Sequence, residues 1–149
     1  LLPRFDELGD VQYHALTTSS LGLAAYAQGD AIDAARWAIR GLIESHRMRD
    51  AAMTTISLEE AIMIAMALER PKVAALLTGA FEGLCERYGV RPPTTVRRFL
   101  YPHDPVAAAH PALGDEDLQA AVARGRRMSL DETMALIVEL GDSVQAEYT

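Results

Sequence analysis

The sequence predicts an all-α protein, and three observations lead to this fold class. Its apolar residues are mainly Ala, Leu, Ile and Met, which favour helix, and no stretch alternates polar and apolar residues as a strand would. Apolar residues instead recur at spacings of three and four. Gly and Asp stand where such segments would end and begin. We therefore expect six or seven helices, paired as antiparallel hairpins, and no sheet.

The first predicted hairpin occupies residues 11–47. Small and apolar residues between Leu16 and Gln28 follow the helical spacing, which indicates a helix over about 11–28. Gly29 suits the left-handed position after that helix, and Asp30 suits the N-cap of the next one. Because the turn is so short, the two helices must be antiparallel. The second helix, 31–47, carries one apolar stripe: Ala34, Ala35, Ala38, Ile39, Leu42 and Ile43.

A second hairpin is predicted over residues 50–89. Its first helix runs from about Asp50 to Leu68, and the next opens with Pro71, whose missing N–H costs nothing in a first turn. Gly89 is a suitable stop. The stretch 57–60, Ser-Leu-Glu-Glu, also has the pattern of a capping box, so the first of these helices could begin there instead. We favour the earlier start.

An offset of forty residues relates the two hairpins. Ala25 then aligns with Ala65, and Ala34 with Ala74, which places small residues where the helices of each hairpin cross. One hairpin per fixed period is typical of an α-solenoid. The sequence thus predicts a TPR-like α-α superhelix with two hairpins over residues 11–89. Residues 1–10 are expected to be the tail of a preceding repeat. Residues 1–5 and the helix from Val11 would then form an exposed apolar edge, and this edge favours dimerisation.

Residues 90–149 lose the period and are expected to form a C-terminal helical cap and tail. The segment 91–93, Arg-Pro-Pro, is a stiff linker, and residues 94–101 are a candidate short helix. Asp104 and Pro105 can open the next helix, and Gly114 with Asp115 can open another, over 116–124. The capping box at 129–132 predicts a last helix through about Leu140, with a frayed tail over 141–149.

Two sets of motifs resemble known families. The pattern from Leu21-Gly22 through Gln28-Gly29-Asp30 to Ala34 resembles a degenerate tetratricopeptide repeat, with Thr18 and Ala38 at positions that are usually aromatic. The segment 74–84 and the segment 112–133 resemble the carboxy-terminal helical repeats of large bacterial, mainly actinobacterial, regulators. That family comprises LuxR-type and MalT-like ATPase regulators and related proteins with a nucleotide-cyclase domain. The departures from its pattern are Leu118, Val122, Arg124 and the Pro102–Pro105 pair.

Composition limits the classes of function. The chain has 14 Lys+Arg and 21 Asp+Glu, a net charge of −7, which argues against direct nucleic-acid binding. The single cysteine, Cys85, excludes an internal disulfide and a Cys-based zinc site. The longest uncharged run, 11–29, contains too many polar residues to be a membrane span. These features predict a cytoplasmic protein without cofactor, metal or membrane partner.

The candidate binding surface is the concave face of the two repeats. In repeat register its residues, expected to form a groove for a peptide or ligand, are Ser19, Leu23, Tyr26, Glu59, Met63 and Met66. An exposed aromatic ring beside thioethers adapts to varied ligands. The alternative is that these residues pack against a missing hairpin or a second copy.

Other polar residues favour structural roles. The histidines, His14, His46, His103 and His110, show no metal-ligand spacing. Cys85 is expected to be a small buried hydrophobe. Glu59 and Glu60 diverge by about 100° on a helix, which favours a solvated face or a cap over acid–base catalysis. The arginines at 97, 98, 124, 126 and 127 are expected to form solvated ion pairs.

Two functions remain open at the sequence level. The resemblance implies a non-catalytic interaction or effector-sensing module of a larger transcriptional or signalling regulator, whose partner is a protein, a peptide or another domain of the parent. No phosphate-binding loop, cyclase metal pair or DNA-reading head occurs in these residues. The alternative is a free-standing small helical enzyme or ligand-binding protein with an unrecognised pocket.

Overall fold

The computed structural model describes residues 1–49, 51–90 and 105–147. These residues form seven helices, and no strand occurs among them, which confirms the all-α prediction. The helices are α1 (Leu2–Leu8), α2 (Val11–Ala27), α3 (Ala31–Arg47), α4 (Ala51–Ala67), α5 (Pro71–Tyr88), α7 (Pro105–Arg127) and α8 (Leu130–Glu147).

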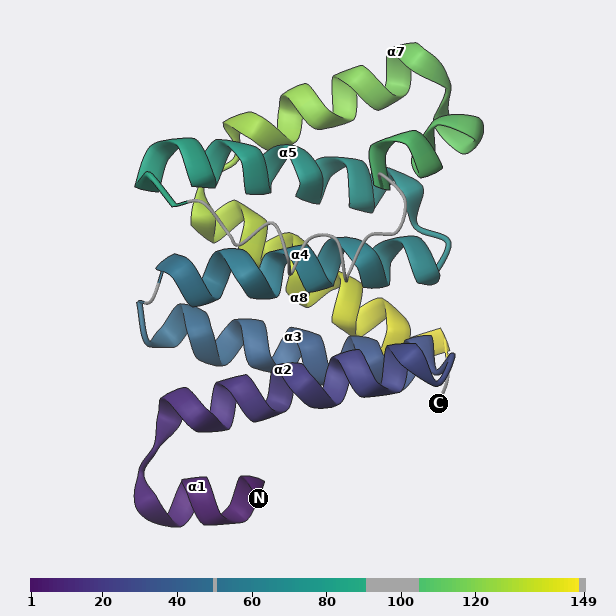
Figure 1. The fold of residues 1–149 in the computed structure, drawn as a ribbon. Helices are drawn as coiled ribbons and strands as arrows, with labels where there is room; N and C mark the ends of the chain where they lie inside the picture. Colours follow the sequence, from purple (N-terminus) through teal and green to yellow (C-terminus); the bar gives the residue numbers. More distant parts are fainter. Residues whose placement is uncertain (50, 91–104, 148–149) are drawn as a thin grey trace.

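Five of the helices form a stack in which each packs on the next. Figure 1 shows α2, α3, α4, α5 and α7 one above another. Helices α2 to α5 alternate in direction, whereas α7 after Gly114 runs parallel to α5, since Gly79 faces Val122 and Gly83 faces Arg126. The last helix, α8, runs obliquely behind the stack and packs against both α3 and α5. The short α1 contacts α2, where Phe5 stacks on Tyr13 with ring centroids 5.8 Å apart, and none of the residues of α1 is buried.

The forty-residue offset is visible in the helix bounds. Helix α4 begins at Ala51 as α2 begins at Val11, and α5 begins at Pro71 as α3 begins at Ala31. Left-handed residues end these helices at positions 9, 29, 49, 69 and 89. Asp30 caps α3 as predicted, because its Oδ1 accepts from the Asp33 N–H at 2.9 Å.

The start of α4 decides between the two sequence alternatives. The helix begins at Ala51, which confirms the earlier start. Ser57 and Glu60 lie inside α4 and are buried, so they do not form a capping box. The apolar side chains around them continue the helix through this position.

The described C-terminal residues, 105–147, follow the predicted helix starts but differ from the prediction at the end of the last helix. Gly114, with φ 75° and ψ 169°, breaks α7 where a helix start was expected. The predicted capping box opens α8: the Ser129 N–H donates to Glu132 Oε2 at 2.6 Å, and the Glu132 N–H donates to Ser129 Oγ at 3.1 Å. The prediction of a frayed tail over residues 141–149 is wrong, because α8 continues to Glu147 and buries Val144. The predicted helix 94–101 and the Asp104 cap lie outside the described residues.

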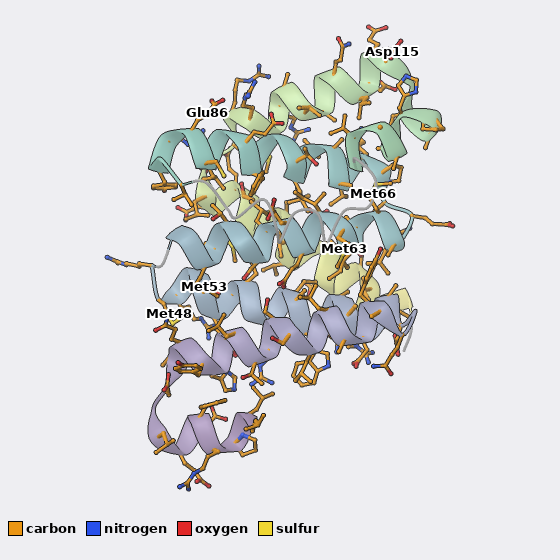
Figure 2. The ribbon with its side chains drawn as sticks, in the orientation of Figure 1. Met48, Met53, Met63, Met66, Glu86 and Asp115 are labelled. Carbon is orange, nitrogen blue, oxygen red and sulfur yellow. The ribbon has the colours of Figure 1, made fainter. Side chains whose placement is uncertain are left out.

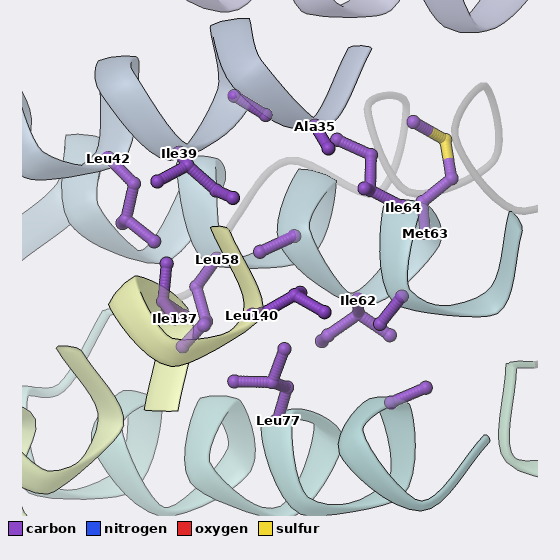
Figure 3. Packing of buried hydrophobic residues seen from close by; sticks show 14 of the residues in the cluster. Ala35, Ile39, Leu42, Leu58, Ile62, Met63, Ile64, Leu77, Ile137 and Leu140 are labelled. Carbon is purple, nitrogen blue, oxygen red and sulfur yellow. The ribbon is translucent and has the colours of Figure 1, made fainter. Parts of the chain in front are cut away.

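The core lies where α3, α4 and α5 meet α8. Figure 3 shows Leu58, Ile62 and Leu77 facing Ile137 and Leu140 of α8. The sequence predicts a core that contains Leu21, Ala25, Ala34, Ala38, Ala65, Ala74, Leu77, Leu84 and Leu130, and the structure buries all of these except Leu21 and Leu130. Leu21 and Leu130 are corrected to half-buried, because both lie at the margin of the packed helices.

The closest helix contact joins α5 and α7. A methyl group added to Gly79 would overlap the Val122 carbonyl oxygen, and one added to Gly125 would overlap the Leu76 carbonyl oxygen. Only glycine allows the two backbones to approach this far. Arg87 then binds the end of α7, donating to the Arg126 and Met128 carbonyl oxygens at 3.1 and 2.5 Å. The crossing therefore depends on backbone approach rather than on large side chains.

The hairpin crossings provide a test of packing. Ala34 and Ala74 are 0% and 1% exposed, with helix neighbours on every side. We expect Ala34→Leu and Ala74→Leu each to lower the free energy of unfolding by about 1–3 kcal/mol, since the extra carbons have no space. Urea melts would measure this, with Ala24→Leu on the exposed face of α2 as the control. Equal midpoints for all three variants would contradict the packing described.

Candidate functional site

The groove expected from repeat register is not an open surface. Ser19, Glu59 and Met63 are buried, at 6%, 1% and 4% exposure, and Leu23 and Met66 are half-buried. Tyr26 alone is exposed. Figure 2 shows Met63 and Met66 on the central helix α4, and Met63 belongs to the main core cluster. The groove prediction is corrected because α4 has neighbours on several sides, so its inward side chains fill the interior.

A buried polar contact joins α2 to α4. Ser19 Oγ donates a short hydrogen bond to Glu60 Oε2. Burial raises the pKa of Glu60 from 4.5 to about 7; the Ser19 hydrogen bond opposes this shift, and the charge of Glu59 adds to it. Glu59 and Glu60 are 1% and 3% exposed, so the prediction of a solvated face is wrong. The apolar surroundings of α4 override the polar character of the two side chains.

A second buried polar group, His14, lies near the start of α2. The buried ring of His14 contacts two carboxylates: Nδ1 lies 2.9 Å from Glu44 Oε2, and Nε2 lies 3.4 Å from Asp6 Oδ1. Thr18 Oγ1 lies 3.4 Å from the same Glu44 oxygen. The other oxygen of Glu44 accepts from Arg40 Nε at 3.1 Å. Glu44 is thus held from three directions, and His14 links α1 and α3 across α2.

A surface groove lies between α3 and the C-terminal half of α8. It has a volume of about 520 Å³. Gly141 lets α8 approach α3, since a methyl group there would lie 3.1 Å from Ile39 Cδ1. Val138 on its α8 side is 42% exposed. The groove has an apolar floor and a charged rim, lined by Ala35, Ile39, Ile43, Val138, Gly141, Val144 and Gln145 and by Arg36, Arg40, Glu44, Arg47 and Asp142.

Three arginines of α3 form one wall of this groove. Arg36, Arg40 and Arg47 lie within about 40° of one another around the helix axis. Arg40 is engaged by Glu44, and its guanidinium carbon lies 6.0 Å from the centroid of the Trp37 ring. Within the described part of the chain, Arg36 and Arg47 make no ion pair. The groove therefore has positive charge available beside apolar surface.

One of the two walls of this groove could have been predicted from the sequence. The arginine spacing of four and then seven residues on a helix predicts a basic stripe, which could have been found from residues 31–47. The opposite wall could not be predicted from the sequence, because no local pattern places residues 138–145 against α3, which lies about a hundred residues earlier in the chain.

The remaining candidates keep structural roles. His110 Nε2 lies 2.6 Å from Asp115 Oδ1 across the Gly114 kink, and His103 lies outside the described residues. Cys85 is half-buried and packs against the core rather than inside it. Arg126 pairs with Glu86 at 2.9 Å and Glu82 at 3.3 Å, at the surface. Among residues 1–49, 51–90 and 105–147, no group of three or more His, Cys, Asp or Glu is arranged to hold a metal ion.

Comparison of the chain with family models, with curated proteins and with solved structures gave no match. In the described part of the chain, every helix is too short or too polar to cross a membrane.

Proposed function

We propose that this chain is a non-catalytic interaction module, built from TPR-like repeats, in a larger bacterial transcriptional or signalling regulator of the LuxR-type, MalT-like or cyclase-containing kind. It acts in the cytoplasm. Its partner is a protein or peptide, or another domain of the same regulator, bound without direct contact to nucleic acid or membrane. Binding would bias the nucleotide-driven switch of the parent protein.

The packing of the family-like segments supports the proposed membership. The segment 74–84 lies on α5, and most of the segment 112–133 lies on α7. Their glycines, Gly79 and Gly125, occupy the closest contact in the fold. The residues that carry the resemblance are therefore those needed for one helix crossing. A shared crossing of this kind is a property of a fold rather than of a reaction.

The observation that carries the proposed binding function is the α3–α8 groove. It combines exposed apolar surface, such as Val138, with two arginines, Arg36 and Arg47, that have no carboxylate partner among the described residues. Arginine beside apolar surface is enriched where proteins bind one another. The groove lies at the surface between two helices, which suits a peptide or protein segment better than an enclosed substrate.

The test uses the complete reading frame that contains this chain. We expect Val138→Asp to reduce the partner-dependent or effector-dependent output of the full regulator several-fold while its melting temperature changes little, because Val138 is 42% exposed. Val11→Asp makes the same change at a residue that is 52% exposed on α2, outside the groove, and serves as the control. A complete reading frame with no further domain, or equal effects of the two variants, would contradict the proposal.

A second candidate function rests on Glu60. A carboxyl group whose pKa lies near 7 is common among catalytic acids and bases, and Ser19 is hydrogen-bonded to it. This favours a small helical enzyme or ligand-binding protein. Glu60 is only 3% exposed, so a substrate would need an opening at α2 and α4. We rank this candidate second, and a free-standing gene of this length would reverse the order.

A further inference from the structure

We infer that the α3–α8 groove binds an acidic, amphipathic helical segment of a protein partner. This inference rests on the proposed function, because it names the class of ligand that the proposed interaction surface receives.

Charge is the first argument for an acidic ligand. The chain as a whole carries −7, yet one wall of the groove presents three arginines. Glu44, the acidic residue beside them, is already bound by Arg40 and His14. The guanidinium groups of Arg36 and Arg47 have no carboxylate partner among the described residues. A ligand with carboxylates at their positions would supply charge-assisted hydrogen bonds that the chain itself does not provide.

The length of the arginine row argues for a peptide rather than a small anion. Arg36 and Arg47 are separated by three turns of α3, about 16 Å along the axis. A single small carboxylate could reach only one of them. A helix lying along the groove can place carboxylates at matching intervals, because its own side chains recur with the same period.

The floor of the groove argues for an amphipathic ligand. Val138 is 42% exposed, and Ile43 is half-buried between the arginine row and α8. Apolar side chains on the same face of the ligand helix would cover these residues and remove them from water. Asp142, on the α8 side, would repel carboxylates from that wall. The ligand is therefore expected to place its acidic side chains toward α3 and its apolar side chains toward α8.

The experiment uses three matched peptides with the full chain. Each is a labelled helical peptide of about sixteen residues with Leu on one face and three variable positions at the spacing of Arg36, Arg40 and Arg47, filled by Glu, by Gln or by Lys. Fluorescence anisotropy is expected to rank affinity as Glu over Gln over Lys, with the Glu peptide weakened by added salt. No binding, or no dependence on the sign of the charge, would overturn the inference.

A paired variant locates the binding. We expect the double variant Arg36→Gln with Arg47→Gln to weaken the Glu peptide about tenfold or more and to remove the ranking of the three peptides. The control is Lys72→Gln with Arg124→Gln, which removes the same charge from exposed residues of α5 and α7. Equal weakening by both pairs would show a general charge effect and would overturn the inference.

Two further readouts separate the possible failures. The first is the backbone amide NMR shift of Val138 on adding dodecanoate. If this shift appears while no peptide binds, the ligand is a small anionic amphiphile and the inference is wrong. If Val138→Asp disrupts the full regulator but the Glu peptide does not bind, the groove has a ligand that is not acidic. The acidic-ligand inference would then fail while the proposed function stands.

Discussion

Gly79→Ala and Gly125→Ala are each expected to lower the free energy of unfolding by about 3 kcal/mol or more. Each added methyl group would overlap a backbone carbonyl oxygen of the facing helix, that of Val122 or that of Leu76. A backbone atom cannot rotate away as a side chain can, so α5 and α7 would have to separate. Chemical denaturation monitored by circular dichroism would measure the loss.

The matched control is a glycine with more space around it. A methyl group on Gly41 of α3 would lie 3.4 Å from the Ser19 nitrogen, which is ordinary van der Waals contact. Alanine also favours helix over glycine by about 1 kcal/mol. Gly41→Ala should therefore be neutral or slightly stabilising. If Gly79→Ala behaves like Gly41→Ala, the close crossing of α5 and α7 is not present in solution.

The helices were predictable because their signals are local. Asp30, Pro71 and the Ser129–Glu132 capping box act within one turn of chain, so their residues alone indicate where α3, α5 and α8 begin. The end of α8 was not predictable in this way. Its last turns are stabilised by burial of Val144 in the core, which is a tertiary contact.

The candidate site was the harder part to predict. Repeat register correctly places Ser19 beside α4, where it bonds Glu60, but register does not show whether a face is covered. Glu59 and Met63 face the interior because α4 lies in the middle of the stack with α8 behind it. The groove that does exist needs α8 to fold back onto α3, a contact between segments about a hundred residues apart. No local pattern encodes that contact.

The stability of the protein is expected to fall as pH rises toward 8, because of Glu60. Its pKa is about 7 in the folded chain against 4.5 as its ordinary value, so the folded state binds the additional proton between these values. The contribution of protonated Glu60 to the free energy of unfolding is fully present below about pH 4.5 and is lost as pH rises through 7. The difference in pKa corresponds to about 3 kcal/mol between these limits.

Glu60→Gln should remove this dependence, since the amide keeps an oxygen for Ser19 and carries no charge at any pH. We expect the variant to be more stable than the original chain at pH 8 by about 1–3 kcal/mol, with a smaller difference at pH 5. Urea melts at both pH values would measure it, with Glu116→Gln on the exposed surface of α7 as the control. A pH-independent difference would show that Glu60 is charged in the folded protein throughout this range, because a buried carboxylate paired with a cation would have no reason to take up a proton.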